Sequence, residues 1–275
     1  MIVTFIGGGN MATALIGGSI AMGTSASGIR VVEPLPAQRD ALAAKFAGID
    51  VFPATSAATI EAADAVVLAV KPQQMRAAAR TLAPLVAHVG VVVTIAAGIR
   101  TADLSRWLDG YRRIVRAMPN TPALVGAGIS GAYATPEVDA KAHEIAAAIL
   151  GAAGDVVWCA REDALDGVTA VSGSGPAYVF YVLEGLEQAA RDLGFGAPDA
   201  RRLAYATVAG AMKLAQQSDA DPATLRAQVT SKGGTTERAL ATLEARGVKA
   251  GLIAAVKDAA ARAKELGDEF GRDDA

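Results

Sequence analysis

Short apolar runs alternate with amphipathic segments over the first 160 residues of the chain. Runs that are apolar at consecutive positions and end near glycine or proline predict strands at residues 2–6, 29–33, 65–70, 91–96, 112–117, 129–134 and 155–158. Segments with helical periodicity lie between them, at residues 10–22, 36–47 and 137–150. Because uninterrupted apolar runs are typical of strands buried on both faces, we expect an α/β fold with a Rossmann-type, doubly wound parallel sheet.

The hydrophobic pattern changes near residue 160. Beyond Arg161 no convincing alternating stretch appears, and helical periodicity covers residues 177–192, 198–217, 222–229, 235–246 and 252–266. Pro176, Pro198 and Pro222 lie at or near the starts of these segments, where a missing N–H costs least. The pattern therefore predicts a Rossmann-like domain over residues 1–160 and an all-helical domain over residues 161–275.

Composition agrees with two domains, because 275 residues exceed the usual size of one domain, roughly 100–150 residues. The formal net charge of −2 gives no reason to expect nucleic acid or an anionic membrane as a partner. The single cysteine, Cys159, excludes a disulfide within one chain, and no metal site is expected. No apolar run reaches the roughly 20 residues that span a bilayer, and the first residues lack a secretion signal. We therefore expect a soluble, cytoplasmic protein.

A glycine-rich turn follows the first predicted strand and opens the first predicted helix. It consists of Gly7, Gly8, Gly9, Asn10, Met11 and Ala12. In a dinucleotide site, Gly7 permits the tight turn, Gly9 lets the backbone approach the pyrophosphate, and Ala12 lets helix and strand pack closely. The alternative is a turn that binds nothing, but the strand–turn–helix context favours an NADPH or NADH site.

Glu33 ends the second predicted strand, where an acidic residue often binds the adenine ribose hydroxyls of NAD. An NADP site more often has a small polar residue there and an arginine nearby. Arg39 is near, but lies several residues into the next helix. The choice between NADPH and NADH stays open at this point, as does the simpler interpretation of Glu33 as a solvated strand end.

Other strand ends carry candidate cofactor contacts. Lys71 and Pro72 follow one strand and could reach the cofactor, or could be a surface lysine before a helix. Asn120 lies in a loop bracketed by prolines, which suits nicotinamide contact and equally suits a structural turn.

A second glycine-rich loop, residues 229–236, precedes a predicted helix in the second half. Several backbone N–H groups and the hydroxyls of Thr235 and Thr236 meet at this helix start, which is a cradle for a carboxylate or phosphate. Ser172 and Ser174 belong to another glycine-rich segment, residues 171–178, which allows a ligand to come close or simply caps the long helix that follows.

The chain offers no obvious acid for reducing a ketone. His88 and His143 are its only histidines, and neither lies in a glycine motif. The 3-hydroxyacid dehydrogenases have a lysine and an asparagine where this chain has Val179 and Val182. A protonated imine accepts hydride without a strong acid, so this absence favours reduction of a C=N bond.

Six motifs along nearly the whole chain together resemble the pyrroline-5-carboxylate reductase family. They are GGGNMA (7–12), AVKP (69–72), IAAG (95–98), RAMPNTPA (116–123), VSGSGPAY (171–178) and TSKGGTT (230–236). The resemblance implies a first domain that binds NADPH or NADH and a helical second domain that forms homodimers, which can assemble into decamers. It also implies cofactor contacts by Ala69, Val70, Lys71, Pro72, Ala96, Ala97 and Gly98.

In that family the Gly-Gly-Thr-Thr loop holds the substrate carboxylate, which maps to Gly233, Gly234, Thr235 and Thr236. Its last threonine, here Thr236, is the proton-donor candidate. We also expect substrate contacts from Ser172, Ser174 and Ser231. The chain departs from the family at Lys232, where proline is usual, and at Glu33, where NADP-preferring members tend to have small polar residues.

The resemblance implies reduction of 1-pyrroline-5-carboxylate to L-proline, the last step of proline biosynthesis. Alternative enzymes are a reductase of another cyclic imine and a hydroxyacid dehydrogenase. The non-enzymatic alternative is a nucleotide sensor that kept the fold and lost turnover.

Overall fold

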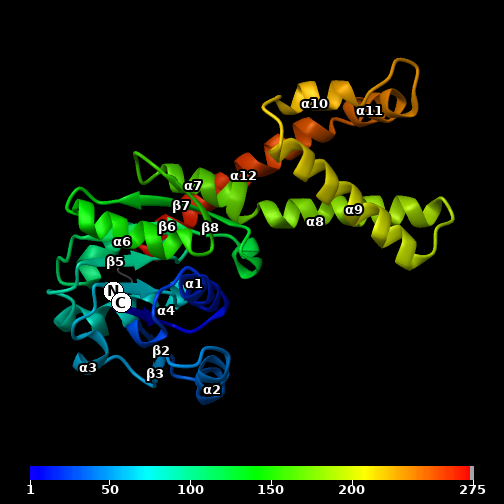
Figure 1. Cartoon of the computed structure of the whole chain (residues 1–275). Coiled ribbons are helices and arrows are strands. Elements are labelled where there is room, and N and C mark those ends of the chain that lie inside the picture. The colour runs from blue at the N-terminus through cyan, green and yellow to red at the C-terminus, as the bar shows by residue number, and fades with distance from the viewer. Residues whose placement is uncertain (273–275) are drawn as a thin grey trace. The chain divides into compact units, whose positions relative to one another are not determined.

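The computed structural model describes residues 1–272, which form two compact units (Figure 1). One contains residues 1–174 together with the described residues from Ala259 onward, and the other contains Gly175–Asp258. The sequence pattern places a boundary near residue 160, whereas the contacts place it after Ser174. The reason is that helix α7 (Ala164–Val168) packs with β6 and β7 of the sheet, and the π-helical turn Thr169–Gly173 packs with α7.

Within residues 1–272 the first unit contains one sheet with the strand order β3-β2-β1-β4-β5-β6-β7-β8. The strands are β1 (Val3–Ile6), β2 (Ile29–Val32), β3 (Asp50–Phe52), β4 (Ala65–Leu68), β5 (Val91–Thr94), β6 (Ile114–Met118), β7 (Gly128–Ala134) and β8 (Gly154–Trp158). Strands β1 to β6 are parallel, which confirms the predicted Rossmann-type parallel sheet for these strands.

Two features of the sheet were not predicted. Strand β3 was missed, and β7 runs antiparallel to β6, with β8 parallel to β7. The direction of β7 follows from the short 3-10 turn Thr121–Val125 that joins it to β6, because a parallel connection needs a crossover of a dozen or more residues.

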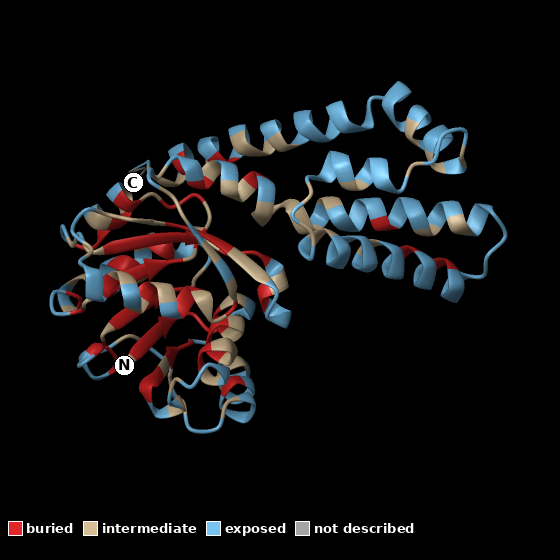
Figure 2. Ribbon diagram, turned by 45° about the horizontal axis from the view of Figure 1, so that its top comes forward, coloured by how far each residue is buried: buried red, intermediate tan, exposed pale blue. Residues whose placement is uncertain are grey.

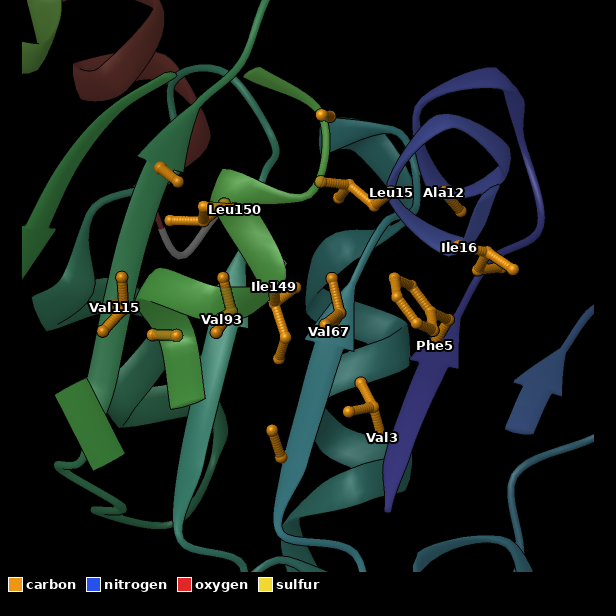
Figure 3. Close-up of a cluster of buried hydrophobic side chains, with 14 of the residues drawn as sticks. Val3, Phe5, Ala12, Leu15, Ile16, Val67, Val93, Val115, Ile149 and Leu150 are labelled. Carbon is orange, nitrogen blue, oxygen red and sulfur yellow. The ribbon is translucent and has the colours of Figure 1, made fainter. Parts of the chain in front are cut away.

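Helices cover both faces of the sheet and form a hydrophobic core on each face. Successive residues of a strand point into these two cores in alternation. One core joins Val3, Phe5, Val67 and Val93 of the strands to α1 (Asn10–Ala21), α2 (Pro36–Lys45) and α6 (Ala140–Gly151) (Figure 3). The other core joins the intervening strand residues, such as Val66 and Val92, to α3 (Ala57–Ile60), α4 (Pro72–Leu82) and α5 (Thr101–Trp107). This two-sided burial confirms the doubly wound architecture.

The second unit is built from helices. They are α8 (Gly175–Asp192), α9 (Ala197–Gln216), α10 (Pro222–Gln228), α11 (Thr235–Ala245) and the first part of α12 (Val248–Phe270), whose remaining residues belong to the first unit. Asp221 caps α10 by accepting the Thr224 N–H at 2.8 Å, and this hydrogen bond lowers the pKa of Asp221. No strand follows Trp158 within residues 1–272, as the sequence pattern predicts.

The two units differ in how far they bury their own side chains (Figure 2). In the second unit only Leu183, Ala200 and Ala204 are buried apolar residues among those that the structure describes. None of the helices within residues 1–272 is both long and apolar enough to cross a membrane.

Candidate cofactor and substrate sites

A pocket of about 750 Å³ lies at the carboxyl ends of β1, β2 and β4. It is the place where open α/β sheets bind ligands, because the strand order reverses between β1 and β4. Of the residues predicted to contact the cofactor, the pocket wall contains Gly7, Gly8, Gly9, Glu33, Ala69, Val70 and Lys71.

Strand register explains why distant motifs meet here. Ile6 pairs with Val32 on one side and with Leu68 on the other, and Leu68 in turn pairs with Thr94. The residues that follow these positions are the glycine turn, Glu33, the Ala69–Pro72 segment and the Ile95–Gly98 segment. Four sequence motifs therefore reach one edge of the sheet at one level.

Gly7 and Gly9 serve different physical purposes in the first turn. Gly7 has φ +100°, donates its N–H to the Val32 carbonyl at 2.8 Å, and would place an added Cβ 2.8 Å from the Ala69 carbonyl oxygen. An added Cβ at Gly9 would meet nothing within 4 Å, and its φ of −70° suits any residue. Neither packing nor backbone conformation requires glycine at position 9, so the open space there fits the approach of a pyrophosphate.

The first turn of α1 presents donors beside this space. Within the described residues, no hydrogen bond from the N–H groups of Asn10, Met11 or Ala12 is formed, as is normal for the start of a helix. Ala12 itself is buried in the core between helix and sheet, as its predicted packing role requires. The residues at this helix start therefore fit a dinucleotide phosphate.

Glu33 is a buried side chain, 7% exposed, in the pocket wall. Its Oε2 accepts the Gly8 N–H at 2.9 Å and its Oε1 accepts the Leu35 N–H at 2.9 Å. The carboxylate therefore holds the glycine turn as well as facing the pocket. Arg39 donates to the carbonyls of Glu33 and Pro34, and it does not line the pocket.

The remaining predicted cofactor residues lie outside this pocket wall. Pro72 is the first residue of α4, with Lys71 as the N-cap. Ala96 and Gly98 are buried after β5, and Ala97 is half-buried. An added Cβ at Gly98 would lie 2.9 Å from the Phe270 ring of α12, a contact that the sequence did not suggest.

Asn120 connects two of the predicted motifs. It is 8% exposed; its Oδ1 accepts the Ile129 N–H at 2.9 Å and its Nδ2 donates to the Ser172 carbonyl at 3.2 Å. Ser172 Oγ donates to the Val168 carbonyl at 3.0 Å, and the Ser174 N–H donates to the Thr169 carbonyl at 2.8 Å. These hydrogen bonds give Asn120 a structural role, because they tie the loop after β6 to the Ser172–Ser174 segment; its contact with the cofactor stays a prediction.

The second glycine loop forms the start of α11 in the second unit. Gly233 has φ +74° and donates its N–H to Glu237 Oε2 at 2.6 Å, while the Gly234 N–H donates to the Ser231 carbonyl at 3.1 Å. Within the described part of the chain, no hydrogen bond from the N–H groups of Thr235 and Thr236 is formed. These two N–H groups and both threonine hydroxyls are therefore the donors that this loop offers to an anion.

Neither histidine lies in a candidate site. His88 Nε2 is 3.2 Å from the Ile60 carbonyl oxygen, and the His143 ring lies 3.9 Å from the Trp158 ring. Within residues 1–272, no group of three or more His, Cys, Asp or Glu side chains is arranged to hold a metal ion.

Two family models match the chain. Residues 162–266 match "Pyrroline-5-carboxylate reductase dimerisation", and residues 2–98 match "NADP oxidoreductase coenzyme F420-dependent". A pyrroline-5-carboxylate reductase of Pseudomonas aeruginosa is 44% identical to this chain over 98% of each sequence. The chain belongs to the pyrroline-5-carboxylate reductase family. Its first unit is an NADP-binding domain.

Solved structures of the family have the same fold. A pyrroline-5-carboxylate reductase from Coxiella burnetii superposes with a TM-score of 0.89, at 39% identity over 96% of this chain and 97% of its own. A pyrroline carboxylate reductase from Plasmodium falciparum, with NADP bound, superposes with a TM-score of 0.85, at 25% identity over 97% of this chain and 98% of its own.

Part of the pocket wall was not predicted from the sequence. Residues 53–55 follow the missed strand β3, and Gln73, Gln74, Ala77, Ala78 and Thr81 lie on α4. The buried positions Met75, Ala79 and Leu82 of α4 repeat at helical spacing, and this signal could have revealed the helix. The short, partly exposed β3 gave no comparable signal.

Proposed function

We propose that the protein reduces 1-pyrroline-5-carboxylate to L-proline with NADPH or NADH. Identity of 44% to a pyrroline-5-carboxylate reductase over almost the whole of both chains is the observation that carries this proposal. The open pocket at the glycine turn and the unpaired donors at the start of α11 support it, because the reaction needs a dinucleotide site and a site for a small carboxylate.

The reaction adds a hydride to the carbon of the protonated imine, and the electron pair of the C=N bond moves to the ring nitrogen, which becomes an amine. The bound nicotinamide cofactor supplies the hydride. The N–H groups of Thr235 and Thr236 hold the substrate carboxylate at the start of α11, where the helix dipole favours negative charge. Gly233 and Gly234 shape this turn, and Ser231 closes it through its carbonyl. Positioning and fixed donors supply most of the rate.

Thr236 is the proposed donor to the ring nitrogen. Its hydroxyl lies in the same turn as the carboxylate donors, so one short segment addresses both polar ends of the substrate. Ser172 and Ser174 in the first unit are proposed as further substrate contacts. Lys232, an exposed residue of this loop, adds a positive charge that assists capture of the anion.

Substitution of Thr236 tests this assignment. Thr236→Ala is expected to lower kcat by up to about 100-fold, the effect of one preorganised donor, while the dissociation constant of the cofactor stays the same. Thr236→Ser keeps the hydroxyl and is expected to recover most of the loss. Parental kcat in Thr236→Ala, measured by oxidation of NADPH with saturating substrate, would contradict the role of Thr236.

The assembly proposed is a homodimer formed through the second unit, with a decamer as the further possibility that the resemblance raises. The matched dimerisation model covers this unit, whose helices expose large apolar side chains such as Phe180 and Tyr181. The cytoplasmic location expected from the sequence stays a prediction.

A further inference from the structure

The last turns of α12 pack against the turn that joins β5 to α5. Gly98 in that turn has φ +74°, and an added Cβ would lie 2.9 Å from Phe270 Cδ2 and 3.4 Å from Leu266 Cβ. Phe270 is half-buried and packs on the core cluster that contains Ala96 and Leu104. Glycine is therefore required at position 98 by backbone conformation and by contact with α12, and neither reason involves a ligand.

Arginine side chains bind the C-terminal end of α12. Arg100 forms an ion pair with Asp268 at 2.7 Å and donates to the Lys264 carbonyl at 3.3 Å. Arg106 donates to the Gly271 carbonyl at 2.9 Å, and Arg76 donates to the Arg272 carbonyl. Gly271 and Arg272 follow the last residue of α12, so their carbonyls have no partner within the helix. Arg106 and Arg76 pair these carbonyls, and together with Arg100 they fix the position of the helix end.

The contacted elements are the two helices that follow the cofactor motifs. Arg76 belongs to α4, which begins directly after Val70 and Lys71, and Arg100 and Arg106 lie at and within α5, which begins shortly after Gly98. The end of α12 therefore joins the helix after β4 to the helix after β5, and the Phe270 ring fills the space beside Gly98.

We propose that the C-terminal turns of α12, with Phe270 at their centre, position the Ile95–Gly98 turn for binding of the nicotinamide cofactor. Phe270 is a positioning residue, since it acts through Gly98. Without the ring, the turn would gain conformational freedom at Gly98. Cofactor binding would then have to order the turn, and the affinity for the cofactor would fall. This inference rests on the proposed assignment of Ala96, Ala97 and Gly98 to the cofactor site.

The test uses the full chain with Phe270→Ala, Phe270→Leu and the control Glu269→Gln. Glu269 is the neighbour of Phe270, but pairs with Arg262 at 2.7 Å on the exposed side of α12, a contact that lowers the pKa of Glu269. Two quantities are measured: hydrogen exchange of residues 95–104 without cofactor, and the dissociation constant of NADPH by fluorescence titration.

Phe270→Ala is expected to speed exchange in residues 95–104 and to raise the dissociation constant by about tenfold. Phe270→Leu is expected to bring the exchange rate and the dissociation constant most of the way back to their parental values. Glu269→Gln is expected to leave both quantities within twofold of the parent. Unchanged exchange in Phe270→Ala, or faster exchange with unchanged NADPH affinity, would overturn the inference. Neither measurement needs turnover, so a parent protein that binds NADPH but fails to reduce pyrroline-5-carboxylate would count against the proposed function alone.

Discussion

The Glu33 carboxylate holds the glycine turn in place and also puts a negative charge in the wall of the pocket. It accepts the N–H groups of Gly8 and Leu35, and it also lines the pocket proposed for the cofactor, at the strand end where the adenine ribose is expected. No arginine lines this pocket, and Lys71 is its only basic residue among those described. The 2′-phosphate of NADPH would therefore lie close to the Glu33 carboxylate, which is largely shielded from solvent.

Removal of this charge is expected to shift the choice of cofactor. The parent protein is expected to use both NADPH and NADH, with only a modest difference in kcat/KM between them. In Glu33→Ser, the kcat/KM for NADPH relative to NADH is expected to rise by about tenfold, because like charges close together in a protein cost a few kcal/mol before solvent screening. Steady-state kinetics with each cofactor measures the ratio.

The control for this prediction is Asp40→Ser, which removes a carboxylate from the exposed side of α2 outside the pocket wall. It is expected to leave the ratio unchanged. An unchanged ratio in Glu33→Ser as well would show that Glu33 does not face the ribose.

Among the elements, β6, α5 and α7 are held together by an ion-pair network around one buried arginine. Arg116 on β6 has a side chain only 6% exposed; its Nη1 is 3.0 Å from Glu162 Oε1 and its Nη2 is 3.6 Å from Asp166 Oδ1. Glu162 also accepts the N–H and the hydroxyl of Thr101, both at 2.7 Å, at the start of α5. One carboxylate thus satisfies a buried cation and a helix N-terminus.

Glu162→Gln is expected to lower the free energy of unfolding by about 1–3 kcal/mol, because it removes the nearer of the two carboxylates that pair with the buried guanidinium and leaves only Asp166. Urea denaturation followed by circular dichroism measures this loss. Glu137→Gln breaks the exposed pair with Arg112 and is the matched control, expected to cost less than about 1 kcal/mol. Equal losses in the two variants would contradict the structural importance of the buried network.

The elements also show what the sequence could and could not reveal. Uninterrupted apolar runs identified the strands of the sheet except β3, because strong burial leaves a clear pattern. The direction of β7 depends on the length of one connection, and the contact of Gly98 with Phe270 joins positions far apart in the chain. From the sequence, Asn120 was equally suited to binding and to structure; its hydrogen bonds show a structural role, and its cofactor contact stays a prediction.

For the whole molecule, the contrast between the two units predicts association. The first unit buries its own apolar residues, whereas the second exposes many, among them Phe180 at 59% and Tyr181 at 77%. Large apolar surfaces of this kind mark interfaces. Light scattering at micromolar concentration is therefore expected to give at least twice the 27.8 kDa mass of one chain.

Tyr181→Glu places a charge on this surface and is expected to shift the protein toward monomer. Lys141→Glu, an exposed charge change on α6 of the first unit, is expected to leave the mass unchanged. A stable monomer in the parent protein would refute the proposed assembly.

The proposed reaction is tested most directly by product formation from a set of substrates. With 1-pyrroline-5-carboxylate, the purified protein is expected to form one L-proline for each NADPH or NADH oxidised, with a higher kcat/KM than for other cyclic imines. A 3-hydroxyacid with NAD(P)⁺ is expected to give no turnover. Failure to form proline, or faster turnover of another imine or of the hydroxyacid, would contradict the assignment.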